Sequence, residues 1–187
     1  MYKLCKTEQS AQRQRELEKG LLEMMKHHRF EEIYVSDLCD RMNLPRKSFY
    51  RYFSNKDGAL YALLDHTLLE FYETGPLEGL RGGTPTGDLD RFFSFWKSHK
   101  DLLDALLRSN LAGMLVERAV SLAKQEELMP GYVKKWEETL KDIAMGFVVC
   151  GLMSMVIQWH TEGYRIPTEQ MASAAVSMLS NPLITSV

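Results

Sequence analysis

Residues 35–53 (VSDLCDRMNLPRKSFYRYF) constrain the fold of this chain more than any other segment. The first part of the segment has the i, i+3, i+4, i+7 spacing of a short helix with one apolar face. The residues with this spacing are Val35, Leu38, Cys39 and Met42. Asn43 follows them, and asparagine is the residue besides glycine that most readily takes the left-handed conformation at a helix end. The segment therefore predicts a short helix that stops at Asn43.

A second short helix is predicted directly after this turn. Pro45 has the fixed φ angle of a helix start and lacks the N–H group that a first helical residue would leave unpaired. Residues 46–53 then place Phe49 and Phe53 on one face and basic or hydroxyl-bearing residues on the others. Two short helices joined by a turn of about three or four residues form a helix-turn-helix, whose second helix reaches base edges in the DNA major groove.

The remainder of the chain also favours helices. No segment alternates apolar and polar residues over the length of a strand. Helices are predicted over residues 7–27, 36–42, 46–53, 56–74, 88–98, 101–125, 132–161 and 168–179. Residues 75–87 (GPLEGLRGGTPTG) are the clear break in this pattern. The sequence therefore predicts an all-α fold with a domain boundary at this break.

Residues 37–60 (DLCDRMNLPRKSFYRYFSNKDGAL) resemble the signature of the TetR (tetracycline-repressor-like) family of transcriptional regulators. The matching residues are Asp37, Leu38, Leu44, Phe49, Tyr50, Tyr52, Phe53, Lys56 and Leu60, with Ser48 in place of a threonine. FFSFWKSHKDLLDALLRSNL and MGFVVCGLMSMVIQWHTEGY resemble the ligand-domain helices of the same family, the latter through Phe147, Gly151, Trp159 and Gly163. The resemblance spans nearly the whole chain.

The resemblance implies an all-α chain in two domains. Residues 1–74 form a helix-turn-helix DNA-binding domain that includes a connecting helix, and residues 75–187 form a helical effector-binding and dimerisation domain. The implied protein is a cytoplasmic homodimer that binds a pseudo-palindromic operator on double-stranded DNA. A mostly apolar small molecule is expected to release the protein from the operator, and a repressor is favoured over an activator. A DNA-binding activator and a constitutive helical dimer without an effector are the alternatives left open.

The resemblance also implies which residues contact DNA. They are Ser36, Arg46, Lys47, Ser48, Tyr50, Arg51, Tyr52 and Lys56. Lys47 stands where the family has a glycine and adds a cation at the groove. Lys56 is at the start of a helix, where its positive charge is unfavourable with the helix dipole. A phosphate of DNA facing this lysine would offset that cost. Ser36 is expected to cap its helix. The charge distribution agrees with a polyanion-binding module, because residues 1–56 hold 12 Lys and Arg against 8 Asp and Glu, and residues 57–187 hold 11 against 17.

Aromatic and methionine side chains are frequent in the second half, and the resemblance implies that some of them line an effector pocket. The candidates are Phe93, Trp96, Met114, Phe147 and Met155. Residues 143–159 carry no charge, but as a helix they would span about 25 Å, less than the ~30 Å hydrocarbon core of a membrane. We therefore expect no membrane association and a helix buried on nearly all sides within protein. Gly146, Cys150 and Ser154, spaced by four, predict packing against residues 168–179 in a dimeric four-helix bundle.

Other classes of protein receive little support. The sequence contains no HExxH, GxSxG, phosphate-binding glycine loop or CxxC motif, so we expect no catalytic residues, metal or cofactor. Three cysteines, without a cleavable apolar leader, suggest a reducing cytoplasm. Cys39 and Cys150 are expected to be small buried residues. The first helix is expected to expose Arg13, Glu18 and other charged residues on a solvated face.

Overall fold

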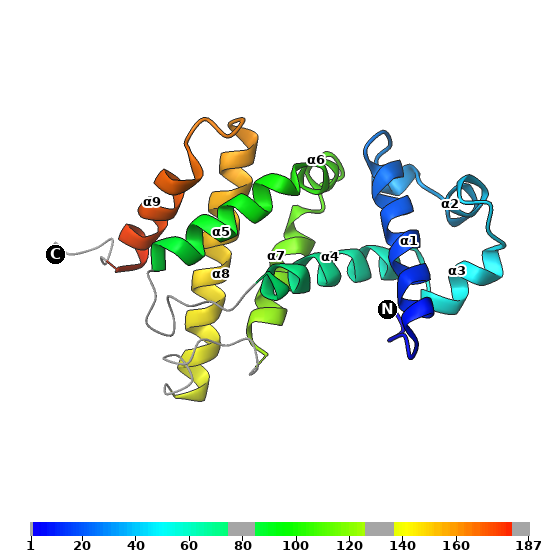
Figure 1. Ribbon diagram of the computed structural model, residues 1–187, viewed down its shortest axis with the longest axis horizontal. Coiled ribbons are helices and arrows are strands. Elements are labelled where there is room, and N and C mark those ends of the chain that lie inside the picture. Colours follow the sequence, from blue (N-terminus) through cyan, green and yellow to red (C-terminus); the bar gives the residue numbers. More distant parts are fainter. Residues whose placement is uncertain (1, 75–84, 126–136, 181–187) are drawn as a thin grey trace. The chain divides into compact units, whose positions relative to one another are not determined.

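A computed structural model describes residues 2–74, 85–125 and 137–180 of the chain (Figure 1). Within these ranges the chain forms helices and no strand, which confirms the predicted all-α fold. The helices are α1 (Glu8–Met25), η1 (Phe30–Glu32), α2 (Val35–Arg41), α3 (Arg46–Tyr52), α4 (Lys56–Glu73), α5 (Pro85–Ser98), α6 (Lys100–Arg108), α7 (Ala112–Ala123), α8 (Glu138–Thr161) and α9 (Thr168–Ser180). The predicted start of a helix at residue 132 lies outside the described residues.

The chain packs into two compact units. The first unit is Met1–Leu68 with Asp101–Arg118, and the second is Leu69–Lys100 with Ala119–Val187. Two helices, α4 and α7, run from one unit into the other. The predicted domain boundary adjoins residues 75–84, which lie outside the described residues, and it stays a prediction.

Two asparagines in the left-handed conformation end helices in the first unit. Asn43 has φ 51°, and the Leu44 amide donates to the Cys39 carbonyl oxygen at 2.9 Å, which closes α2 with the bond of a Schellman motif. This confirms the predicted turn. Asn110 has φ 58° and ends α6 in the same way, with the Leu111 amide 2.8 Å from the Leu106 carbonyl oxygen. The single helix predicted over 101–125 is therefore wrong, because the apolar spacing continues across this turn.

The core of the first unit is formed by α1 to α4. Its large buried side chains include Leu17, Leu21, Met25, Leu38, Phe49, Phe53, Leu60 and Leu64. Cys39 is also fully buried, as predicted, and burial raises the pKa of its thiol. The α6 helix joins this unit at the loop after α1, where Arg108 Nη1 donates to the Met25 carbonyl oxygen at 3.0 Å and Ser109 Oγ accepts from the Phe30 amide at 2.9 Å. These contacts fix the segment that leads into α2 and α3.

A polar network is buried in the same unit. Glu18 is 1% exposed and lies 2.9 Å from His66 Nδ1, so the prediction of a solvated Glu18 is wrong. Asp65 is 5% exposed and accepts from Arg118 Nε at 2.6 Å, Arg118 Nη2 at 2.7 Å and Tyr2 Oη at 2.8 Å. Burial, together with the bond to Asp65, raises the pKa of Tyr2 to about 12. We call Tyr2, Asp65 and Arg118 the Asp65 cluster. It joins the N-terminal segment, α4 and α7.

The second unit packs α5 along α9 and against α8. Its aromatic core includes Phe93 and Trp159, whose rings meet edge to face with centroids 5.8 Å apart, and Trp96 is equally buried. Trp159 Nε1 donates to the Ile166 carbonyl oxygen at 2.8 Å, which ties the loop after α8 to that helix. Gly163 has φ 72°, the left-handed conformation that ends α8.

Only four of the 24 residues of α8 are buried in the single chain, whereas a helix buried on nearly all sides was predicted. Its buried side chains are Met145, Met153, Val156 and Trp159. Phe147 is 71% exposed and Ile143 64%, and Cys150 is exposed rather than buried as expected. Among the described residues, α8 is also long and apolar enough to cross a membrane, a test that core helices of water-soluble proteins pass as well. One chain covers only one side of α8, and burial of the other side against a second copy stays a prediction.

Candidate nucleic-acid interface

The α3 helix separates an aromatic buried face from a basic exposed face. Pro45 precedes it with φ −60°, and Phe49 and Tyr52 point into the core. The opposite face carries the other predicted DNA-contacting residues of this helix, whereas Tyr52, also predicted to contact DNA, is mostly buried. Arg46, Lys47 and Arg51 are exposed, Tyr50 is 50% exposed and Ser48 is half-buried. The positions i, i+1, i+4 and i+5 therefore present three cations and a phenol on one side of a seven-residue helix.

The start of α2 differs from the prediction. Tyr34, rather than Ser36, is the residue before the first helical turn, and its amide donates to Asp37 Oδ2 at 3.4 Å. Ser36 is half-buried in the first turn, and its hydroxyl donates to Asp37 Oδ1 at 3.3 Å. The predicted cap is therefore wrong, because α2 already begins at Val35 and Ser36 lies inside its first turn. The DNA contact of Ser36 stays a prediction.

Lys56 is the first residue of α4, and its side chain binds backbone carbonyl groups of the segment before α2. Its Nζ donates to the Ile33 carbonyl oxygen at 2.6 Å, and also to that of Phe30 and, at 3.4 Å, to that of Glu31. The ammonium also lies 4.4 Å from the centroid of the Phe30 ring. Burial lowers the pKa of this lysine. Lys56 thus fixes the segment before α2, a structural role that the sequence analysis did not foresee, and its phosphate contact stays a prediction.

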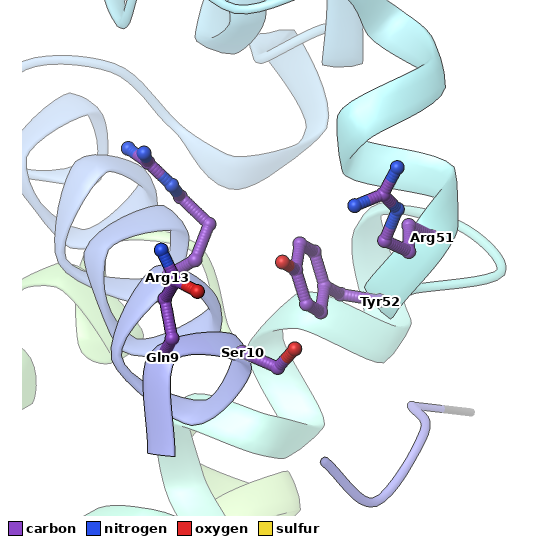
Figure 2. Close-up of a pocket in the computed structure, with 5 residues that line it drawn as sticks. All are labelled: Gln9, Ser10, Arg13, Arg51 and Tyr52. Carbon is purple, nitrogen blue, oxygen red and sulfur yellow. The ribbon is translucent and has the colours of Figure 1, made fainter. Parts of the chain in front are cut away.

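The structure adds α1 to the surroundings of α3. A cleft of about 240 Å³ lies between the two helices. It is lined by Gln9, Ser10, Arg13, Arg51 and Tyr52 (Figure 2). Arg51 and Tyr52 were predicted to contact DNA, whereas the three residues of α1 were not. Helical spacing identifies the exposed face of α1 but not what that face lies beside, so the sequence held no signal for this part of the site.

The predicted effector-pocket residues are not gathered at one place. Phe93 and Trp96 are core residues of the second unit, Met155 is half-buried there, and Phe147 is on its surface. Met114 belongs to the first unit. The effector pocket stays a prediction. In the part of the chain that the structure describes, no group of three or more His, Cys, Asp or Glu side chains is placed to hold a metal ion.

Comparison with known proteins identifies the fold. No protein-family model matches the chain, and no curated protein matches its sequence. Solved structures do match it, among them the dihydroxyacetone kinase operon activator DhaS, with a TM-score of 0.61 and 16% identity over 90% of this chain and 94% of that one. A TetR-family transcriptional regulator from Streptomyces coelicolor matches with a TM-score of 0.54 and 17% identity, over 89% of this chain and 78% of that one. The TetR-family repressor AlkX from Dietzia sp. matches with a TM-score of 0.53 and 16% identity, over 88% and 91%. The chain has the fold of TetR-family regulators, which confirms the resemblance seen in its sequence.

Proposed function

We propose that this chain is a transcriptional repressor that binds a pseudo-palindromic operator as a homodimer and releases it when a mostly apolar small molecule binds. The observation that carries the proposal is the exposed basic face of α3 in a helix-turn-helix. Regulation of transcription by this fold is supported by its structural neighbours, one described as an activator and another as a repressor. Activation is therefore the alternative, and a reporter gene behind the operator distinguishes the two.

Base recognition falls to the N-terminal half of α3. Arg46, Lys47 and Ser48 are at the end of the helix that reaches base edges in this motif. Tyr50 and Arg51 follow on the same exposed face. Together with Ser36 at the start of α2, they donate hydrogen bonds to phosphates of the DNA backbone. Arginine and lysine donate to guanine O6 and N7 in the major groove, so the two cations favour guanine in each half-site.

Arg46→Ala and Lys47→Ala test base recognition. Each should lower operator affinity by about 1–3 kcal/mol per base contact and relax the preference at particular base pairs, because each removes a donor to a base edge. Selection of duplexes from a random pool by the purified protein measures the preference. Lys19→Ala is the control, since Lys19 is an exposed cation on α1 to which no DNA contact is assigned in this proposal. An unchanged preference in Lys47→Ala would mean that Lys47 is an ordinary surface residue.

Lys56→Met tests the two roles of Lys56 separately. Loss of the ammonium leaves the carbonyl groups of Phe30 and Ile33 without this donor, so we expect the free energy of unfolding to fall by about 1–3 kcal/mol. If Lys56 also contacts a phosphate, the slope of log affinity against log salt should decrease in magnitude by about 1 on all DNA alike. Thermal unfolding measures the first effect and titration at several salt concentrations the second. A lower melting temperature with an unchanged slope would leave Lys56 only its structural role.

The exposed apolar face of α8 supports the proposed dimerisation. Leu140, Ile143 and Phe147 are each more than half exposed, and no part of the described chain covers them. The small residues Gly146, Cys150 and Ser154 continue this face, and a Cβ built on Gly146 meets nothing within 4 Å. Exposed apolar patches of this kind mark protein contacts. A second copy of α8, together with α9, would complete a four-helix bundle and place two recognition helices about 34 Å apart.

Effector control requires that the ligand bind the DNA-competent and DNA-incompetent forms with different affinity. The α4 helix begins at Lys56 beside the helix-turn-helix and continues into the second unit, so it is the proposed link. A coupling of about 2 kcal/mol per subunit would lower operator affinity roughly a thousandfold in a dimer.

A thermal-shift screen of apolar compounds tests this step. At least one stabilising compound should release operator DNA, and operator DNA should weaken its binding equally. If every stabilising compound left DNA affinity unchanged, the protein would be a constitutive DNA-binding dimer without effector control.

A further inference from the structure

The cleft between α1 and α3 is lined entirely by hydrogen-bond donors. Its lining residues are Gln9, Ser10, Arg13, Arg51 and Tyr52, and none of them is acidic. Figure 2 shows the arginines extending from the two helices on either side of the cleft, with the Tyr52 ring between them. Two guanidinium groups beside an amide and two hydroxyls suit an oxyanion, because the planar fork of arginine matches the oxygens of a phosphate.

Tyr52 brings an unpaired hydroxyl to this cleft. Its side chain is only 7% exposed, and the hydroxyl is directed toward α1 (Figure 2). No residue in the described ranges forms a hydrogen bond with this hydroxyl. The backbone of Tyr52 is fixed, since its carbonyl oxygen accepts from the Lys3 amide at 3.0 Å. The hydroxyl itself is open to solvent in the cleft, so a ligand oxygen can reach it there.

Both arginines have donors left for a ligand. Arg51 is exposed and pairs with no acidic side chain of the described residues. Arg13 Nη1 donates to Glu16 Oε2 at 2.9 Å, but the two side chains are 52% and 43% exposed. An exposed pair of this kind contributes about 0–1 kcal/mol, so a phosphate can compete for the guanidinium. The guanidinium group has five N–H donors, and Glu16 occupies one of them at this distance.

We propose that this cleft binds a phosphodiester group of the DNA backbone, so that the DNA contact extends from the helix-turn-helix onto α1. The inference rests on the proposed function and deepens it. Arg51 and Tyr52 are at the C-terminal end of the helix that carries Arg46 and Lys47, and seven residues span only about 10 Å. A duplex held at one end of α3 therefore has backbone within reach of the other end. Free phosphate has the same chemistry, and the experiment separates the two sources.

The test compares Arg13→Gln with two variants of the same helix. Arg15→Gln makes the same charge change about 200° around the α1 axis, outside the cleft lining. Glu16→Gln keeps Arg13 and removes its carboxylate partner. Affinity is measured with a duplex selected by the purified protein and with an unrelated duplex of equal length. Arg13→Gln should weaken both by about tenfold and reduce the magnitude of the salt slope by about 0.9, because a phosphate contact is independent of sequence. Arg15→Gln should leave the affinity for DNA unchanged. Glu16→Gln should leave it unchanged or raise it.

Three results would overturn the inference. If Arg13→Gln binds DNA no more weakly than Arg15→Gln, the cleft makes no contact with DNA. If Glu16→Gln weakens binding as much as Arg13→Gln, the role of Arg13 is to stabilise α1 through its pair with Glu16. If calorimetric titration with inorganic phosphate shows saturable binding that Arg13→Gln abolishes while DNA affinity is unchanged, the cleft binds the free ion. Arg46→Ala and Lys47→Ala test the proposed function separately from the cleft. If these two variants lose DNA affinity but Arg13→Gln does not, only the proposed phosphate site in the cleft is rejected. If none of the three variants loses DNA affinity, both the phosphate site and the proposed DNA-binding function are rejected.

Discussion

Gly151→Asp should produce a folded monomer whose operator affinity is about 10²–10⁴-fold lower, because linked binding of two half-sites is lost. Gly151 is exposed on α8, and a Cβ built on it meets nothing within 4 Å in the single chain. The protomer therefore has room for the new side chain. In a bundle of two copies, by contrast, the carboxylate would be buried without a partner. Sedimentation measures the mass, and titration of the operator measures the affinity.

Gly113→Asp is the matched control for this substitution. Gly113 is also an exposed helical glycine with open space around its Cβ, but it is near the start of α7. The control should remain a dimer with wild-type operator affinity. A Gly151→Asp protein that stays dimeric would contradict the role of α8 in assembly. A monomer that binds the operator as tightly as the wild type would contradict the need for two recognition helices.

Asp65→Ala should lower the free energy of unfolding by about 2–4 kcal/mol, a large share of the roughly 5–15 kcal/mol typical of a domain. The carboxylate is 7% exposed and pairs with both Arg118 and Tyr2, so its removal leaves a guanidinium and a phenol without their acceptor. The estimate is below that for a fully buried pair because the Arg118 side chain is 32% exposed. Chemical denaturation of the protein at fixed concentration measures the change.

Two further variants show whether this loss belongs to the Asp65 cluster. The double variant Asp65→Ala/Arg118→Met should recover part of the stability, because it removes the stranded charge together with its partner. Glu138→Ala removes the exposed partner of Lys141 and should cost less than about 0.5 kcal/mol. If Asp65→Ala were no more destabilising than Glu138→Ala, the Asp65 cluster would not hold α4 and α7 together.

The local fold was predictable wherever one residue type has one dominant backbone preference. Asn43 and Pro45 define the turn of the helix-turn-helix, and the structure has the left-handed φ and the helix start that they imply. Asn110 has the same conformation but was overlooked, because the apolar spacing of α6 continues into α7 without a change of pattern. Periodicity shows that a segment is helical, and it is less sensitive to a single residue that redirects the chain.

The candidate site was predictable in part for a related reason. The exposure of Arg46 and Lys47 follows from helical spacing within a single short helix. The cleft beside Arg13, the carbonyl contacts of Lys56 and the burial of Glu18 depend on contacts between residues far apart in the chain. Net charge and periodicity carry no information about such pairs. The apolar face of α8 was expected to be buried, but hydropathy alone does not say whether the covering atoms belong to the same chain or to a second copy.

The exposed side of α8 also has a consequence for mixtures of subunits in a cell. The surface proposed to join protomers is on a different unit from α3, so a subunit with a disabled recognition helix would still assemble with intact ones. Such a mixed dimer carries one working helix and loses the linked second half-site. With random pairing of subunits, the share of dimers that carry two intact recognition helices equals the square of the intact fraction. Alleles that damage α3 should therefore be dominant over the wild type, whereas alleles that damage the α8 surface should be recessive.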